Sequence, residues 1–236
     1  MPEKKAAPAT TLALFDIDGT LIRRAGPHHR LALVDAVRAV AGVETTTDHI
    51  PLQGMLDPDI LSLMMRRAGL KPAAIRRMMP EVVERAQTLY ARRCPSLENK
   101  VCPGARMLLW RLFRRGVPTG LVTGNLTRIG WKKMERAGLR RYFRFGAFSE
   151  HARDRAGLLR LAVRTATAAG WIARGARVTL VGDHPNDIRA AQANGARSVA
   201  VATGLSSAEE LAEHKPDVLL PDLRAIDLET LFGFEK

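Results

Sequence analysis

Cysteine, aromatic residues and long apolar runs are all scarce in this sequence of 236 residues. Its two cysteines, Cys94 and Cys102, form no CxxC pair, and no histidine spacing suits zinc, which argues against a zinc site. No window approaches the ~18 uninterrupted apolar residues of a membrane helix, and residues 1–10 lack the apolar stretch of a secretory signal. We therefore expect a cytoplasmic protein with free thiols, no membrane partner and a flexible tail over residues 1–10.

Acidic residues are also few, because 24 Asp and Glu stand against 37 Lys and Arg, for a net charge of +13. The excess is concentrated in residues 128–164, a basic region with eleven Lys or Arg against Glu135, Glu150 and Asp154. An anionic partner or an arginine-rich surface would each account for it. Aromatic residues are not interleaved with this charge, and no helix-turn-helix or zinc-finger pattern occurs, so we do not expect specific nucleic-acid binding.

One stretch near the start combines an apolar strand with paired carboxylates. Residues 12–15 read as a buried strand, and Asp16 and Asp18 follow it, one residue apart, before Gly19 and Thr20. Two neighbouring carboxylates are unfavourable unless a cation or a shared proton relieves their repulsion, and Mg²⁺ is the cation that such oxygen ligands suit. An Asx-rich surface turn is the other interpretation of these residues alone.

The rest of the chain alternates between strand and helix, with one helical interruption. Residues 28–93 show only helical periodicity, whereas strands and helices alternate from residue 105 onward. This order predicts a parallel α/β sheet with an inserted helical domain. The later strands are expected over 117–123, 144–148, 178–181, 198–202 and 218–220, and a closing helix over 223–231.

Three of these strands end in polar turns. Asp16 to Thr20 follows the first strand, Thr123-Gly124-Asn125 a second, and Gly182-Asp183 with Asp187 a third. Parallel strands place their carboxyl ends on one edge of the sheet, where open α/β sheets bind ligands. The sequence therefore predicts one polar site built from all three turns.

In this order the turns resemble the haloacid dehalogenase (HAD) superfamily of aspartate-nucleophile phosphotransferases, and within it phosphoglycolate phosphatase-like hydrolases with a helical cap. The first motif of that superfamily, DxDGT, is matched by residues 16–20, the second by 121–125 and the fourth, GDxxxD, by 182–187. The resemblance covers nearly the whole chain after the tail. It implies a Rossmann-like core over 11–24 and 101–236 and a helical cap over 25–100.

The resemblance also implies a role for each matched residue. Asp16 would be the nucleophile that forms an aspartyl-phosphate, and Asp18 the general acid and then base. Mg²⁺ would be held by Asp16, Asp183 and the backbone carbonyl of Asp18, and Asp187 would ligate it directly or orient a water bound to it. Phosphate oxygens would be held by Thr123, Gly124 and Asn125. For Asp187, inside a helix, a purely structural capping role is the alternative.

Two positions depart from the pattern of the superfamily. The third motif usually supplies a lysine, but residues 150–158 contain none, and Arg155 is the best replacement, with Arg153 second. A solvated arginine at a helix start is the alternative for Arg155. In the cap, Met55 stands where relatives often carry an arginine, which leaves the substrate open; Arg23, Arg24, His28 and His29 could face the site or lie on the surface.

We therefore predict a Mg²⁺-dependent phosphatase that acts on a small phosphorylated metabolite, as a monomer or homodimer. A phosphomutase would share all these motifs. A catalytically silent protein that binds polyanions through residues 128–164 is the alternative from another class. A dehalogenase is disfavoured, because haloalkanoate chemistry does not need Asp18 as an acid and base.

Overall fold

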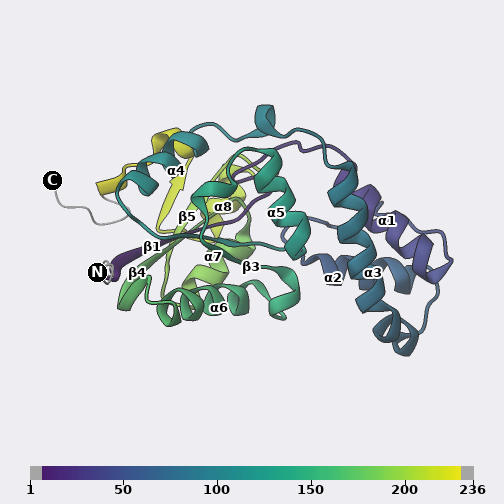
Figure 1. Ribbon diagram of the computed structural model, residues 1–236. Helices are drawn as coiled ribbons and strands as arrows, with labels where there is room; N and C mark the ends of the chain where they lie inside the picture. The colour runs from purple at the N-terminus through teal and green to yellow at the C-terminus, as the bar shows by residue number, and fades with distance from the viewer. Residues whose placement is uncertain (1–6, 230–236) are drawn as a thin grey trace.

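The computed structural model describes residues 7–229, which form a parallel sheet flanked by helices (Figure 1). All six strands pair in parallel, in the order β3-β2-β1-β4-β5-β6. The strands are β1 (Ala9–Phe15), β2 (Thr119–Val122), β3 (Phe145–Ala147), β4 (Ile172–Gly182), β5 (Arg197–Val201) and β6 (Val218–Leu220). The predicted fold class, a Rossmann-like α/β sheet, is confirmed.

The central strand β1 is buried on both faces, as its apolar run requires. Leu12 and Leu14 pack into one apolar cluster, and Ala13 and Phe15 into another, because successive side chains point to opposite faces. The first cluster holds α6 (Arg155–Ala168) and α7 (Pro185–Gln192), and the second holds α4 (Ala105–Arg114) and α5 (Thr127–Arg136). The sheet is therefore covered by helices on both faces, with α8 (Ala208–Glu213) beside α7 and β5.

Between β1 and α4 lie three helices, which we call the helical insertion: α1 (His28–Ala41), α2 (Asp57–Arg67) and α3 (Pro72–Arg93). The structure describes residues 25–100 in full, and no strand occurs there. Figure 1 shows the insertion at one end of the molecule, beside the sheet. Its apolar residues belong to the same cluster as those of α4 and α5. The boundaries 25–100 for a cap and 11–24 with 101–236 for a core stay a prediction.

Three sequence-based boundaries are wrong. Strand β1 begins at Ala9 and not at residue 12, so residues 9 and 10 of the expected tail belong to the sheet, where Ala9 pairs with Ile172 of β4. Strand β4 begins at Ile172, six residues before its predicted start. Arg174, Gly175 and Arg177 hide the apolar pattern of this part of the strand, which also shifts register against β1. The predicted helix over 223–231 is replaced at its start by a 3₁₀ turn, Leu223–Ala225, and residues 226–227 are not helical; its end lies outside the described residues. Four 3₁₀ turns are described in all: Glu98–Lys100, Arg140–Tyr142, Ser149–His151 and Leu223–Ala225. Within residues 7–229, every helix is too short or too polar to span a bilayer.

Candidate active site

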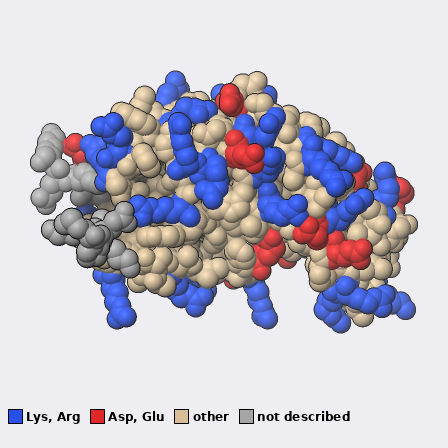
Figure 2. Space-filling model, viewed as in Figure 1, with Lys and Arg blue, Asp and Glu red and all other residues tan. Residues whose placement is uncertain are grey.

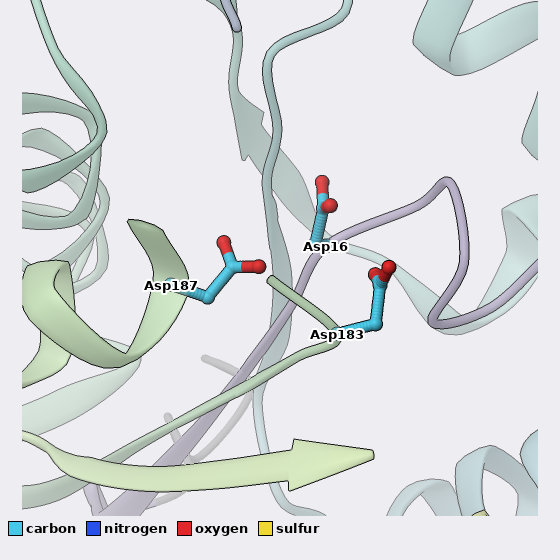
Figure 3. A group of neighbouring side chains, drawn as sticks. All are labelled: Asp16, Asp183 and Asp187. Atoms are coloured by element: carbon cyan, nitrogen blue, oxygen red, sulfur yellow. The ribbon is translucent and has the colours of Figure 1, made fainter. Parts of the chain in front are cut away.

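Three carboxylates meet at the carboxyl edge of the sheet. Asp16 follows β1, Asp183 follows the neighbouring strand β4, and Asp187 lies in the first turn of α7 (Figure 3). Each offers one oxygen to a group whose members all lie within 4.8 Å of one another. The three residues are buried, with exposed fractions of 5%, 5% and 2%. The strand order places them together, because β1 and β4 are adjacent in the sheet although they lie far apart in the sequence.

Asp183 is held in a space that two glycines leave open. The hydroxyl of Thr20 donates a hydrogen bond to its Oδ1 at 2.7 Å. A Cβ atom at Gly19 would lie 2.0 Å from Oδ2 of Asp183, and one at Gly204 would lie 1.8 Å from the same oxygen. Gly19 also has φ +86°, a conformation that side chains resist. The glycine of the DxDGT turn therefore serves both the turn and the neighbouring carboxylate.

The electrostatics of this cluster call for a cation. Burial, together with the charges of Asp16 and Asp187, raises the pKa of Asp183 well above its ordinary value. Burial raises the pKa of Asp187 to about 7, despite the opposing charge of Arg155. The Oδ1 atom of Asp187 is buried and accepts no hydrogen bond. Buried carboxylate oxygens in close contact, one of them unsatisfied, fit a hard divalent ion such as Mg²⁺.

Arg155 is the nearest cation to the cluster. It begins α6, and its Nη1 donates hydrogen bonds to Asp16 Oδ1 at 2.9 Å and to the carbonyl of Val122 at 3.2 Å. The same nitrogen lies 3.4 Å from Asp187 Oδ1. Only 7% of Arg155 is exposed, so it is not the solvated arginine of the alternative interpretation, whereas Arg153 is exposed. Its Nε is buried without a hydrogen-bond partner, which leaves a donor available beside Asp16.

The side chain of Asp18 is separate from the acidic cluster. Its Oδ2 accepts hydrogen bonds from Lys133 Nζ at 2.6 Å and from Asn125 Nδ2 at 2.8 Å. Burial pushes the pKa of Asp18 up, but the charges of Lys133 and His29 outweigh that effect and lower the pKa below its ordinary value. Asp18 is therefore held as a carboxylate at the edge of the cavity, with 45% of its side chain exposed.

The turn after β2, residues 123–125, forms the rest of the floor of a cavity at the sheet edge. Thr123 is fully buried, and its Oγ1 accepts a hydrogen bond from Asn125 Nδ2 at 2.8 Å. Gly124 approaches the helical insertion closely, since a Cβ there would lie 2.3 Å from the carbonyl oxygen of Met55. All three residues of this turn line the same cavity as Asp16, Asp18 and Arg155.

The helical insertion closes over this floor and leaves a cavity of about 810 Å³. Asp57, at the start of α2, donates its backbone N–H to the carbonyl of Gly124 and accepts at Oδ2 from the backbone N–H of Leu126, at 2.9 and 2.8 Å. Asn186 Nδ2 donates to the carbonyl of Gly54 at 2.8 Å. The cavity is therefore bounded by the sheet edge on one side and by the insertion on the other.

The structure thus brings most of the predicted residues together. Arg23, Arg24 and His29 line the cavity as well, whereas His28 is not among its lining residues. Sequence reasoning missed two residues, Lys133 and Asp57. Lys133 carries a recognisable signal, because it falls four residues after Ile129 on the buried face of α5, a position where a lysine is unexpected.

Four of the eleven cations in the basic region 128–164 have a carboxylate partner among residues 7–229. Arg128 pairs with Glu84, Lys132 with Glu135, Lys133 with Asp18, and Arg155 with Asp16. Figure 2 shows the Lys and Arg side chains of one face spread over the whole surface, with smaller groups of Asp and Glu among them. These internal partners account for several of the region's charges without an external polyanion.

The comparisons with known proteins agree on one family. A family model described as haloacid dehalogenase-like hydrolase matches residues 10–195. A phosphoglycolate phosphatase from Agrobacterium fabrum is 28% identical over 223 residues, which cover 93% of this chain and 91% of that protein.

Solved structures with the same fold include two bacterial proteins that match nearly end to end. CbbY from Rhodobacter sphaeroides, crystallised as a mutant with xylulose-1,5-bisphosphate, superposes with a TM-score of 0.71 at 21% identity, over 94% of this chain and 98% of that one. A β-phosphoglucomutase from Clostridium difficile gives 0.67 at 18% identity, over 95% of each chain. At these identities the structures establish the fold.

Proposed function

Because this chain belongs to the haloacid dehalogenase-like hydrolase family, we propose that it is a Mg²⁺-dependent phosphatase that hydrolyses a small phosphorylated metabolite through an aspartyl-phosphate. The observation that carries this proposal is the buried group of Asp16, Asp183 and Asp187, with Arg155 bonded to Asp16, at the floor of a cavity. Curated relatives are named phosphoglycolate phosphatase, which supports a phosphoric monoester as substrate.

Asp16 is the proposed nucleophile. The bond from Arg155 to Oδ1 fixes the carboxylate and leaves Oδ2 without a hydrogen-bond donor among residues 7–229. One carboxylate oxygen attacks phosphorus, and the bond from phosphorus to the ester oxygen breaks. Mg²⁺ held by Asp16, Asp183 and Asp187 would offset the repulsion between this carboxylate and the phosphoryl oxygens.

Asp18 is the proposed acid and base. In the free site it is a carboxylate, because Lys133 lowers its pKa, and the negative charge of an arriving phosphate raises that pKa again. The protonated form then gives its proton to the leaving oxygen. As a carboxylate once more, it takes a proton from the water that attacks the aspartyl-phosphate and releases phosphate and Asp16.

Arg155 and the turn after β2 are the proposed phosphate-holding groups. The free Nε donor of Arg155 belongs to the same guanidinium that contacts Asp16, and guanidinium groups bind phosphate through parallel hydrogen bonds. The hydroxyl of Thr123 and the backbone around Gly124 and Asn125 line the cavity beside it.

The proposed cytoplasmic location is supported by the free thiols of Cys94 and Cys102.

The deciding experiment is hydrolysis of an aryl phosphate with and without Mg²⁺, for the unmodified protein, Asp16→Asn and the exposed control Asp48→Asn. We expect Mg²⁺-dependent hydrolysis that Asp16→Asn abolishes and Asp48→Asn retains. We also expect mass spectrometry to find one phosphoryl group on the Asp18→Asn protein, since that variant cannot activate water. Hydrolysis that survives Asp16→Asn would contradict the proposal.

A phosphomutase is the second candidate, because the insertion is bonded to the cavity floor through Asp57 and Asn186 and a β-phosphoglucomutase shares the fold. Such an enzyme would pass the phosphoryl group of Asp16 to a second substrate hydroxyl. Isotope-labelled water separates the two reactions, because only the phosphatase incorporates the label into released phosphate.

A further inference from the structure

The cavity at the sheet edge is much larger than the phosphoryl group that would react in it. Its volume is about 810 Å³, within the roughly 300–1,000 Å³ of pockets that hold whole small-molecule ligands. A phosphoryl group beside Asp16 and Arg155 occupies only a small part of this space. The chemistry of the remaining wall therefore indicates what the rest of the ligand carries.

Where the helical insertion lines this cavity, it contributes four large apolar side chains, which we call the apolar wall: Leu33, Leu52, Met55 and Ile60. Leu33 belongs to α1 and Ile60 to α2, and Leu52 and Met55 lie in the segment between these helices. Leu33 and Ile60 are buried in the apolar cluster that the insertion shares with α4 and α5. Leu52 and Met55 pack against that cluster and stay partly exposed. The wall is therefore an open side of the apolar cluster.

The segment that carries Leu52 and Met55 is held in place by its main chain. The N–H of Met55 donates to the carbonyl of Leu52 at 3.4 Å, and the carbonyl of Gly54 accepts from Asn186 Nδ2 at 2.8 Å. A Cβ atom at Gly54 would lie 2.2 Å from His184 Nδ1, so this turn rests directly on the loop after β4. The turn thus presents two apolar side chains to the cavity from a fixed backbone.

The apolar wall adjoins the proposed reaction centre. A Cβ atom at Gly124, in the turn after β2, would lie 2.3 Å from the carbonyl oxygen of Met55 and 3.6 Å from Nη2 of Arg155. Met55 and the guanidinium proposed to hold phosphate are therefore both neighbours of one glycine. A ligand with its phosphate at Arg155 has the apolar wall beside the rest of its chain.

Two polar side chains beside the wall, His29 and Lys133, already use their hydrogen-bonding groups within the protein. His29 lies one helical turn before Leu33 in α1, and its Nε2 is 3.0 Å from Asp57 Oδ2. Lys133 directs its three N–H bonds to Asp18, Asn125 and His29. A polar ligand group placed here would lose its hydrogen bonds to water without a replacement from either residue, which costs free energy. An apolar group carries no such cost.

The exposed polar side chains of the cavity differ, because water already solvates them. They are Gln53, Arg23, Arg24 and Arg30. The pKa of Asp222 is lowered by its hydrogen bond from Arg224 and also by the charge of Arg23, so Arg23 interacts with a carboxylate of the protein. Positive charge at these exposed positions suits the attraction of an anionic phosphate ester toward the cavity.

We propose that the substrate is a phosphate monoester with an apolar organic part, and that the apolar wall binds this part while the phosphate lies at Asp16. This inference rests on the proposed phosphatase function. Methionine is flexible and adapts to groups of different shape, so Met55 suits an alkyl chain or an aromatic ring. Removal of the organic part from water supplies the hydrophobic contribution to binding.

The test compares binding, so that it does not depend on turnover. Three series of phosphonates with matched chain lengths, which resist hydrolysis, are titrated calorimetrically into the Mg²⁺-loaded protein: alkylphosphonates, ω-hydroxyalkylphosphonates and ω-carboxyalkylphosphonates. We expect each added methylene of the alkyl series to tighten binding about two- to fourfold until the wall is covered. At the best chain length the alkyl ligand should bind about fivefold or more tighter than either polar ligand.

The variant Leu52→Asn with Met55→Gln replaces two apolar side chains by polar ones of similar size. It should remove most of the gain with chain length and leave the binding of methylphosphonate within about twofold. Both positions are partly exposed, so the fold should persist, which a thermal melt checks. Leu31→Asn is the matched control, because Leu31 is an exposed leucine of α1 that is not among the lining residues.

Three results would overturn the inference: no gain with chain length, a polar series that binds as tightly as the alkyl series, or a gain that survives in the double variant. Failure of the phosphatase function is recorded separately, as absence of hydrolysis of any phosphate monoester.

Discussion

The ammonium of Lys133 lies 2.6 Å from Oδ2 of Asp18, although only 1% of the lysine side chain is exposed. The same ammonium lies 2.6 Å from Asn125 Oδ1 and 3.2 Å from His29 Nδ1. A buried lysine is costly unless it is paired and hydrogen-bonded, and here each of these three partners lines the cavity. Lys133 therefore joins the proposed acid and base to the turn after β2 and to α1.

Replacing Lys133 by Met should lower phosphatase turnover at least tenfold, because Asp18 and Asn125 lose the donor that orients them. The loss of stability should be smaller than the ~3–5 kcal/mol of a fully buried pair, since 45% of the Asp18 side chain is exposed. Steady-state kinetics and thermal melts measure the two effects. Lys132→Met is the control, because the one ion pair of Lys132 among residues 7–229 is with Glu135; equal effects of the two variants would contradict the assignment.

Replacing Arg155 by Ala should lower turnover at least tenfold, since Asp16 loses its hydrogen bond and the phosphate loses a guanidinium. Arg155→Lys should recover part of the rate, because lysine keeps the charge but not the fork of donors. Arg153→Ala serves as the control, because Arg153 is exposed. A loss of rate with Arg153→Ala and none with Arg155→Ala would move the role to Arg153.

Replacing Gly19 by Ala should abolish the binding of Mg²⁺, since the new Cβ would lie 2.0 Å from Asp183 Oδ2. Gly69→Ala is a close control: Gly69 has the same φ of +86°, but a Cβ atom there would have no neighbour within 4 Å. The difference between the two variants isolates the clash from the backbone strain. Calorimetric titration with Mg²⁺ measures it, and unchanged binding by Gly19→Ala would exclude Asp183 as a ligand.

Stability should respond to pH and Mg²⁺ together. Because the pKa of Asp187 is raised to about 7 in the folded, metal-free protein, the folded state holds a proton that the unfolded chain releases near its ordinary value of 3.8. The stabilisation from this proton is full below that value and is lost as the pH rises through about 7. Metal binding replaces the proton, so Mg²⁺ should raise the Tm more at about pH 8 than at about pH 5.5.

The control for this effect is Asp187→Asn, which carries no titrating proton. Thermal melts in chelator and in excess Mg²⁺, at several pH values, give the comparison. The variant should weaken both the pH dependence in chelator and the gain from Mg²⁺, and the pH dependence that remains should come from Asp183, whose pKa burial and Asp16 also raise. A gain from Mg²⁺ that is independent of pH in the unmodified protein would contradict the assignment of Asp187.

The sequence was sufficient to predict the sheet edge and its acidic cluster, because these depend on local patterns. Apolar strands that end in Asp16, Thr123 and Asp183 are each recognisable on their own, and parallel pairing brings the ends together. Arg155 was predicted from its place between two motifs. The pattern of β1 and the helix start at Pro185 are likewise local, since burial and the first-turn proline act within a few residues.

Lys133 and Asp57 could not be placed in the same way. The interaction of Lys133 with Asp18 spans 115 positions and depends on how α5 packs against the turn after β1. Asp57 resembles an ordinary acidic residue at a helix start, yet it accepts from the backbone of Leu126 in another part of the fold. Both contacts arise from tertiary packing, which a single sequence with one lysine among several does not specify.

Three contacts that seat the insertion on the sheet edge share one property: each has a main-chain atom on at least one side. Asp57 meets the backbone of Gly124 and Leu126, and Asn186 meets the carbonyl of Gly54. Main-chain groups are present whatever residue occupies their position. Most side chains of the insertion that face the ligand can therefore diverge during evolution without breaking these hydrogen bonds. One reaction centre can then be retained while the range of substrates changes.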